Sequence, residues 1–134
     1  MTTRAIGTFD VTLNAQVTEG YAEDGTLGRM TIDKQLHGDL EGSSKGQMLT
    51  AMSSVKGSAG YVAIERVTGK LHGRSGSFAL QHSGTMNRSA PTLIIAVVPD
   101  SGTGELVGLS GTLGIDIADG KHSYVLEYAI DGGQ

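Results

Sequence analysis

Apolar and polar residues alternate with a period of two over most of this chain, and glycine interrupts the alternation at short intervals. A period of two places successive side chains on opposite faces of a strand, whereas an amphipathic helix needs a period near 3.6. In residues 7–13, for example, Phe9, Val11 and Leu13 fall on one face. The chain has 21 glycines and no tryptophan in 134 residues, which suits tight turns and close backbone approaches rather than a helical bundle. The pattern predicts an all-β protein, and the length predicts a single domain over residues 1–134.

About eight strands follow from the alternation. They are expected at residues 7–13, around the same-face residues Met30, Ile32, Leu36 and Leu40, and at residues 47–56, 60–67, 70–82, 92–98, 104–117 and 121–130. The stretch "EGSSKG" at 41–46 is expected to be a loop, and the segment around 16–26 has no pattern. Residues 92–98, "TLIIAVV", are apolar on both faces, which predicts a strand that is covered on both sides.

The sequence "IADGKH" predicts a hairpin with Asp119-Gly120 as its two-residue loop, because both central residues must tolerate a positive φ. This register pairs Ile117 with His122, Ile115 with Tyr124 and Leu113 with Leu126. One largely apolar face results, made of Leu113, Ile115, Ile117, His122, Tyr124, Leu126 and Tyr128. It is expected to form a core or the wall of a cavity.

A second hairpin is predicted at "RVTGKL", with Thr68-Gly69 as the loop and Glu65 opposite His72. The same register places Ala63 opposite Arg74. The face that carries these ionisable groups then contains Tyr61, Ala63, Glu65, His72, Arg74, Phe78, Leu80 and His82. A bulge at a glycine would reverse the alternation and move some of them to the other face.

Eight antiparallel strands without a covering helix close most economically into a barrel, because closure removes the exposed sheet edges. Such a barrel has room for side chains and for one small ligand. A sandwich is the alternative, and it would turn Val62, Ile64 and Leu71 inward and expose Glu65 and Arg74. The expected fold is an eight-stranded antiparallel β-barrel.

Three segments, "GYVAIERVTGKLHGRSGSFALQH", "VVPDSGTGELVGLSGTLGI" and "KHSYVLEY", carry a resemblance to known barrels. The glycine pattern of the second resembles that of the allene oxide cyclase and dirigent barrels. From about residue 5 to 130 the chain resembles the bacterial domain of unknown function 3224, whose barrel is similar to that of allene oxide cyclase. The resemblance implies an eight-stranded barrel with a largely apolar cavity and no particular reaction. The plant cyclases enclose a fatty-acid epoxide and have a glutamate in the cavity, which makes Glu65 a candidate counterpart.

Composition narrows the functional classes. A formal charge of −4 with scattered lysines and arginines argues against nucleic acid and anionic membranes as partners. The chain has no cysteine, no long apolar run and no apolar secretion signal at its start, so a cytoplasmic location is expected. The four histidines lack the spacing of metal ligands, and "SGTGELVG" lacks the lysine and the helix of a phosphate-binding loop. Neither a metal nor another cofactor is therefore expected.

Two functions remain open for the ionisable face. In a cofactor-independent isomerase or cyclase, Glu65 would act as acid or base, Arg74 would position it, and His72, His82 or Tyr61 would assist. In a non-catalytic barrel, the same groups would recognise a polar group on a small hydrophobic ligand. The ligand-binding candidates are Tyr61, Phe78, Leu80, His82, His122, Tyr124 and Tyr128. If this face is instead solvent-exposed, Glu65 and His72 form a surface cross-strand pair with Arg74 nearby. A purely structural barrel with a filled interior is a third interpretation.

The opposite face predicts an oligomer. If Glu65 and Arg74 face inward, then Val62, Ile64, Leu71 and Ala79 face outward. Exposed apolar strips of this kind are more usual at subunit contacts than on a bare surface, so we expect a homo-oligomer.

Overall fold

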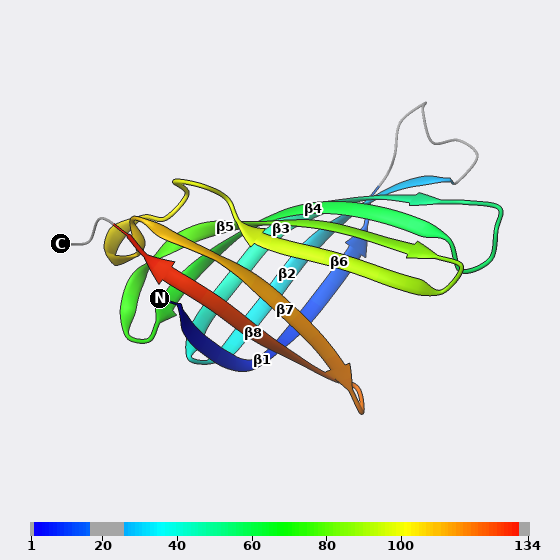
Figure 1. The fold of residues 1–134 in the computed structure, drawn as a ribbon. Coiled ribbons are helices and arrows are strands. Elements are labelled where there is room, and N and C mark those ends of the chain that lie inside the picture. The colour runs from blue at the N-terminus through cyan, green and yellow to red at the C-terminus, as the bar shows by residue number, and fades with distance from the viewer. Residues whose placement is uncertain (1, 17–25, 132–134) are drawn as a thin grey trace.

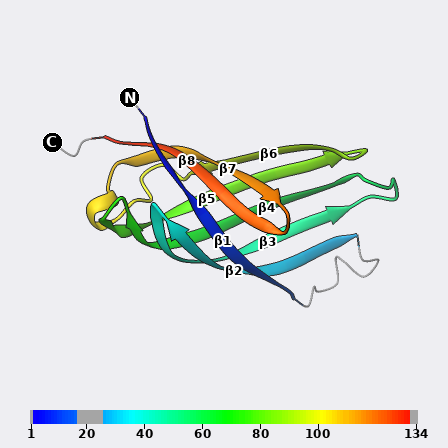
Figure 2. The same cartoon turned by 90° about the horizontal axis from the view of Figure 1, so that it is seen from below.

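Eight antiparallel strands form a closed barrel in the computed structural model, which describes residues 2–16 and 26–131 (Figures 1 and 2). The strands are β1 (Thr3–Ala15), β2 (Leu27–Gly38), β3 (Leu40–Met52), β4 (Ala59–Leu71), β5 (Arg74–Asn87), β6 (Ala90–Val97), β7 (Leu109–Ala118) and β8 (Lys121–Ile130). A 3-10 turn, η1 (Gly104–Leu106), takes the place of the expected beginning of the seventh strand. The predicted fold class is confirmed. Most of the patternless segment around 16–26 lies outside the described residues.

The barrel has two distinct ends (Figure 1). The turns at Gly38–Asp39 and His72–Gly73 lie at one end with η1, the start of β1 and the end of β8, and we call it the terminal end. The β3–β4 and β5–β6 turns lie at the other end, which we call the mouth. Within the described residues no helix is long and apolar enough to cross a membrane.

The strands are bridged along most of their length, with one exception. Between β6 and β7 the bridged residues are Ala96 and Thr112 alone. Beyond Val97 the chain leaves β7 and runs along β5, where the Val98 N–H donates to the carbonyl of Ala79 at 2.9 Å. The junction between β6 and β7 is therefore the weakest seam of the barrel.

The β7–β8 hairpin has the predicted register. Ile117 pairs with His122, and Asp119 and Gly120 have φ values of 53° and 76°. These positive values at both central positions are those of the expected tight loop.

The predicted β4–β5 turn is wrong. The turn residues are His72 and Gly73, with φ values of 48° and 81°, so Glu65 pairs with Leu80 and not with His72. Gly69 lies inside β4, where a Cβ would stand 2.1 Å from the carbonyl oxygen of Glu41. This glycine permits a close approach of two strands rather than a turn.

The predicted loop at 41–46 is wrong for the same reason, since these residues belong to β3. A Cβ at Gly42 would stand 2.2 Å from the carbonyl oxygen of Thr68, and one at Gly46 would stand 2.1 Å from that of Ile64. Both glycines allow β3 to pack tightly on β4. The polar stretch therefore continues the strand and carries Ser44 into the barrel, where it is buried.

The inward faces supply the core, which includes Phe9, Leu36, Leu40, Val67, Phe78, Leu80, Ile95, Leu113 and Leu126. Val62 and Ile64 face outward as predicted and are 51% and 52% exposed. Leu71, predicted to face outward, is buried because β4 continues to this residue. Ala79, also predicted outward, is covered by the segment after β6, where Ser101 accepts a hydrogen bond from its N–H.

The outer face of β6 is not covered, contrary to expectation, because Ile94 is 62% exposed. Together with Leu49, Val62 and Ile64 it forms an exposed apolar strip on the outside of the barrel. Of the four residues on which the predicted homo-oligomer rested, Val62 and Ile64 are exposed, and the homo-oligomer stays a prediction.

Candidate functional site

A pocket opens at the mouth of the barrel between the inner faces of β3, β4, β5 and β6. Its volume is about 300 Å³. The wall is largely apolar and includes Met48, Met52, Tyr61, Met86, Pro91 and Leu93. Three of the five methionines in the chain line it. Because a methionine side chain is flexible and polarisable, such a wall can adapt to ligands of differing shape.

Four polar side chains from consecutive strands meet inside the barrel next to this pocket. Glu65 of β4 accepts hydrogen bonds from Lys34 of β2 at 2.8 Å and from Ser44 of β3 at 2.5 Å, and it bonds Nε2 of His82 from β5. All four residues are buried, with Glu65 1% exposed and Lys34 6% exposed. We call Lys34, Ser44, Glu65 and His82 the ionic cluster. The ring of Tyr61 joins it to the pocket, with its centroid 6.3 Å from that of His82.

The cluster keeps Glu65 ionised. Burial by itself would raise the pKa of this carboxyl group, but the hydrogen bond with His82, the charge of Lys34 and the Ser44 hydroxyl outweigh it and lower the pKa to about 2. The Lys34 ammonium also lies 4.9 Å from the centre of the Phe9 ring, a favourable cation–π distance. The cluster is therefore a paired and hydrogen-bonded set of charges in an apolar interior.

Arg74 and His72 do not join Glu65, contrary to the predicted register. Arg74 is exposed beside the β4–β5 turn, and its charge acts on the Tyr128 phenol. His72 occupies the turn, where its Nδ1 lies 2.5 Å from the hydroxyl of Tyr128 and its Nε2 lies 3.5 Å from Asp39. Both residues thus belong to the terminal end. Because the turn lies at His72-Gly73 and not at Thr68-Gly69, both residues are far from Glu65 along the strands.

Sequence analysis missed Lys34 and Ser44. Lys34 shares the face of Ile32 and Leu36, so an ionisable group on an apolar face was the signal that could have revealed it. Ser44 was hidden because its stretch was assigned to a loop. A strand that continued from Leu40 would have placed Ser44 on the buried face.

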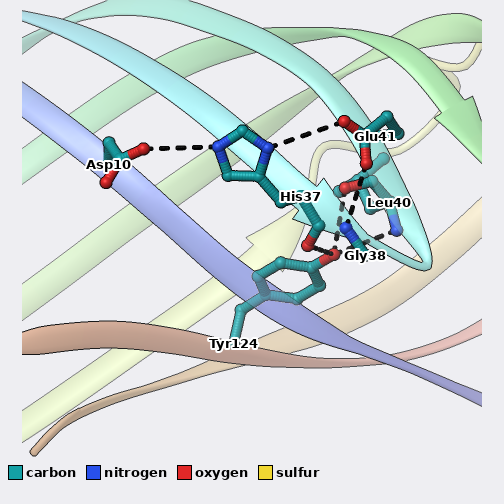
Figure 3. Close-up of polar contacts among 6 residues, drawn as sticks. All are labelled: Asp10, His37, Gly38, Leu40, Glu41 and Tyr124. Carbon is teal, nitrogen blue, oxygen red and sulfur yellow. Dashed lines mark hydrogen bonds and ion pairs between the residues drawn. The ribbon is translucent and has the colours of Figure 1, made fainter.

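Tyr124 has a structural role at the terminal end (Figure 3). Its buried hydroxyl accepts a hydrogen bond from the N–H of Leu40 at 2.9 Å and has the carbonyl oxygens of His37 and Leu40 at 2.9 and 3.0 Å. It thereby closes the β2–β3 turn from inside. The absence of a side chain at Gly7 makes room, because a Cβ there would stand 2.4 Å from the Tyr124 hydroxyl oxygen.

The outer side of the same turn is held by His37 (Figure 3). Its Nε2 lies 3.3 Å from Asp10 and its Nδ1 lies 3.6 Å from Glu41. Glu41 also accepts a hydrogen bond from the N–H of Gly38 at 3.1 Å. All three side chains of this set are exposed, so it supports the turn at the surface and does not extend the pocket.

Replacing Tyr124 with phenylalanine should lower the free energy of unfolding by about 1–3 kcal/mol, because the buried Leu40 N–H would lose its partner. Tyr61 provides a matched control, since its hydroxyl makes no hydrogen bond among the described residues. The Tyr61→Phe change should stay within about 0.5 kcal/mol. Denaturant midpoints of the two variants test this, and equal losses would contradict the structural role of Tyr124.

The remaining ligand-binding candidates are spread through the barrel. Phe78 and Leu80 are fully packed in the core, and Tyr128 is buried beside His72. His122 is half-buried, with its ring centroid 5.1 Å from that of Phe9. Of the predicted set, Tyr61 lines the pocket, and the ring of His82 lies 6.3 Å from that of Tyr61, centroid to centroid. In the part of the chain that is described, no three histidine, aspartate or glutamate side chains converge as metal ligands.

Comparison with known proteins agrees with the barrel architecture and confirms the predicted family. A crystal structure of a protein of unknown function from Shewanella oneidensis MR-1, assigned to the DUF3224 family, is 49% identical and superposes with a TM-score of 0.92. The match covers 98% of each chain. A search of curated proteins gives no match. The family model described as "Protein of unknown function (DUF3224)" matches residues 5–128, and the chain therefore belongs to the DUF3224 family.

Proposed function

We propose that this protein binds a small, largely apolar molecule in the pocket at the mouth of its barrel. The observation that carries the proposal is an apolar pocket of about 300 Å³ that adjoins a buried ionic cluster through Tyr61. Ligand sites in proteins typically combine a hydrophobic concave wall with a few convergent polar groups, and their volumes begin near 300 Å³. The pocket is of this kind and suits a compact ligand.

The state of Glu65 favours binding over acid–base catalysis. A general acid or base works best when its pKa lies near the working pH. The pKa of Glu65 is lowered to about 2, because His82, Lys34 and Ser44 outweigh the opposing effect of burial. At neutral pH this carboxylate has no proton to give, and it is a weak base. We therefore assign the ionic cluster a role in shaping and polarising the floor of a binding site.

The pocket can be tested by narrowing it. Ala59 lines the pocket, whereas Ala51 on the neighbouring strand is exposed and faces outward. We expect Ala59→Leu to weaken the binding of 1-octanol and 2-octanone by roughly tenfold or more, because the added atoms occupy ligand space. Ala51→Leu adds the same atoms outside and should leave affinity unchanged.

Binding would be followed by NMR of protein labelled with 13C at the methionine methyl groups. Met48, Met52 and Met86 line the pocket, so their signals should shift saturably with added ligand. If neither probe produces a saturable shift up to its solubility limit, or if the two alanine variants weaken binding equally, the pocket is not the binding site.

A further inference from the structure

We propose that the pocket selects a ligand with a neutral hydroxyl group, which donates a hydrogen bond to Nδ1 of His82 and accepts one from the hydroxyl of Tyr61. This inference rests on the proposed binding function and specifies the class of ligand, an apolar alcohol or phenol. It is carried by two polar groups near the pocket whose hydrogen-bonding capacity no other described residue uses.

The first of these groups is Nδ1 of His82. The side chain is only 5% exposed, and its Nε2 is engaged by Glu65. Nδ1 has no hydrogen-bond partner among the described residues. Every fully buried side-chain nitrogen or oxygen among these residues has a partner, so Nδ1 is not fully buried. Nδ1 must therefore be reachable from open space. The neighbouring ring of Tyr61 lines the pocket, and Gly84, two residues after His82 on β5, lines it too, so the proposal takes the pocket as the space from which a ligand reaches Nδ1.

The hydrogen bond to Glu65 determines which nitrogen of the His82 ring carries a proton. An ionised carboxylate only accepts hydrogen bonds, so Nε2 of His82 must donate to Glu65. In a neutral imidazole the other nitrogen then has no proton and is an acceptor. Lys34 lies 2.8 Å from Glu65 and already supplies the positive charge that balances it. Nδ1 thus requires a donor from the ligand.

The second group is the Tyr61 hydroxyl, which likewise has no hydrogen-bond partner among the described residues. Burial, and next the nearby negative charge of Glu65, raise the pKa of Tyr61 above its ordinary value. The phenol therefore keeps its proton at neutral pH and can donate. The two rings are tilted by 49° with their centroids 6.3 Å apart, so one small group can lie against both.

A hydroxyl group matches both requirements at once. A ketone can accept from Tyr61 but cannot donate to His82, so one acceptor would stay unsatisfied inside the site. A carboxylate also lacks a donor, and it would add a negative charge next to Glu65, whose own charge Lys34 already balances. The expected order of affinity is alcohol, then ketone, then carboxylate. The apolar body of the ligand would contact Met48, Met52 and Met86.

The test compares 1-octanol, 2-octanone and octanoate at pH 7.5 by methionine-methyl NMR of the whole protein. We expect 1-octanol to bind about tenfold more tightly than 2-octanone and octanoate to bind weakest, because a site that bonds a hydroxyl discriminates against analogues without one. In His82→Gln the glutamine amide can still donate to Glu65 but has no counterpart of Nδ1. This variant should lose the preference for 1-octanol while its affinity for 2-octanone stays the same.

Tyr61→Phe serves as a second variant, because the Tyr61 hydroxyl makes no hydrogen bond to any other described residue. It should weaken both 1-octanol and 2-octanone, since both accept from this hydroxyl. A direct readout is the 15N resonance of His82, whose Nδ1 should be unprotonated at pH 7.5 and should shift with 1-octanol. Equal affinity for 1-octanol and 2-octanone, or a protonated Nδ1, would overturn the hydroxyl proposal and leave the pocket intact. Loss of all binding would instead overturn the proposed function.

Discussion

Replacing Glu65 with glutamine should lower the free energy of unfolding by roughly 3–5 kcal/mol, because Lys34 would keep a buried charge without its counter-ion. The glutamine amide would also place its N–H groups against the hydrogen-bond donors that bind the carboxylate in the wild type. Urea midpoints of wild type and variant measure the change. A paired control is Glu127→Gln, which breaks an exposed pair with Arg4 and should cost about 0–1 kcal/mol.

The double variant Glu65→Gln and Lys34→Met separates the two causes of this loss. It removes the unpaired charge, so most of the stability lost in Glu65→Gln should return. If Glu65→Gln costs no more than Glu127→Gln, the pair is not desolvated. The ionic cluster would then be a surface feature, and the site built on it would fail.

The second large effect is expected on lowering the pH. Protonation of Glu65 should lower the free energy of unfolding, because it removes the same negative charge as the glutamine variant. The pKa of Glu65 is about 2 in the folded state, because the interactions with His82, Lys34 and Ser44 outweigh burial, against an ordinary value of 4.5. A lowered folded-state pKa stabilises the protein fully above pH 4.5, and this contribution is lost as the pH falls toward 2. The shift corresponds to about 3 kcal/mol.

The measurement is the urea midpoint of wild type and of the double variant from pH 6 to pH 2. Other carboxylates titrate in both proteins, so the difference between the two curves isolates the ionic cluster. Wild type should lose about 3 kcal/mol more than the double variant across this range. Parallel curves would show that Glu65 has the same pKa in the folded and unfolded protein.

The faces of the strands could be predicted from sequence, but their partners could not. The β4–β5 turn lies four residues after the predicted Thr68-Gly69, and a shift by an even number of residues leaves the side chains on either side of the shifted segment on their faces. Leu71, inside that segment, changes face. Glu65 and His82 were therefore placed inside together, while Arg74 was assigned to the wrong neighbour. The cause is an ambiguity of glycine, which serves equally for a turn and for close packing of two strands.

The composition of the site was less predictable than its location. Lys34 belongs to β2 and Glu65 to β4, and neither propensity nor local spacing connects them across β3. Only the closed sheet brings the two side chains together on its inner face. Tyr124 shows the same limit, because its partners lie in the β2–β3 turn, more than eighty residues earlier in the chain.

The weak seam between β6 and β7 makes the barrel compliant on one side. Strand β6 carries Pro91 and Leu93 of the pocket wall, and across its far edge it is bridged to β7 only where Ala96 meets Thr112. Separating β6 from β7 therefore breaks only this bridge, whereas separating β5 from β4 or β6 from β5 would break many interstrand hydrogen bonds. A ligand larger than the pocket would be accommodated by separation of β6 from β7.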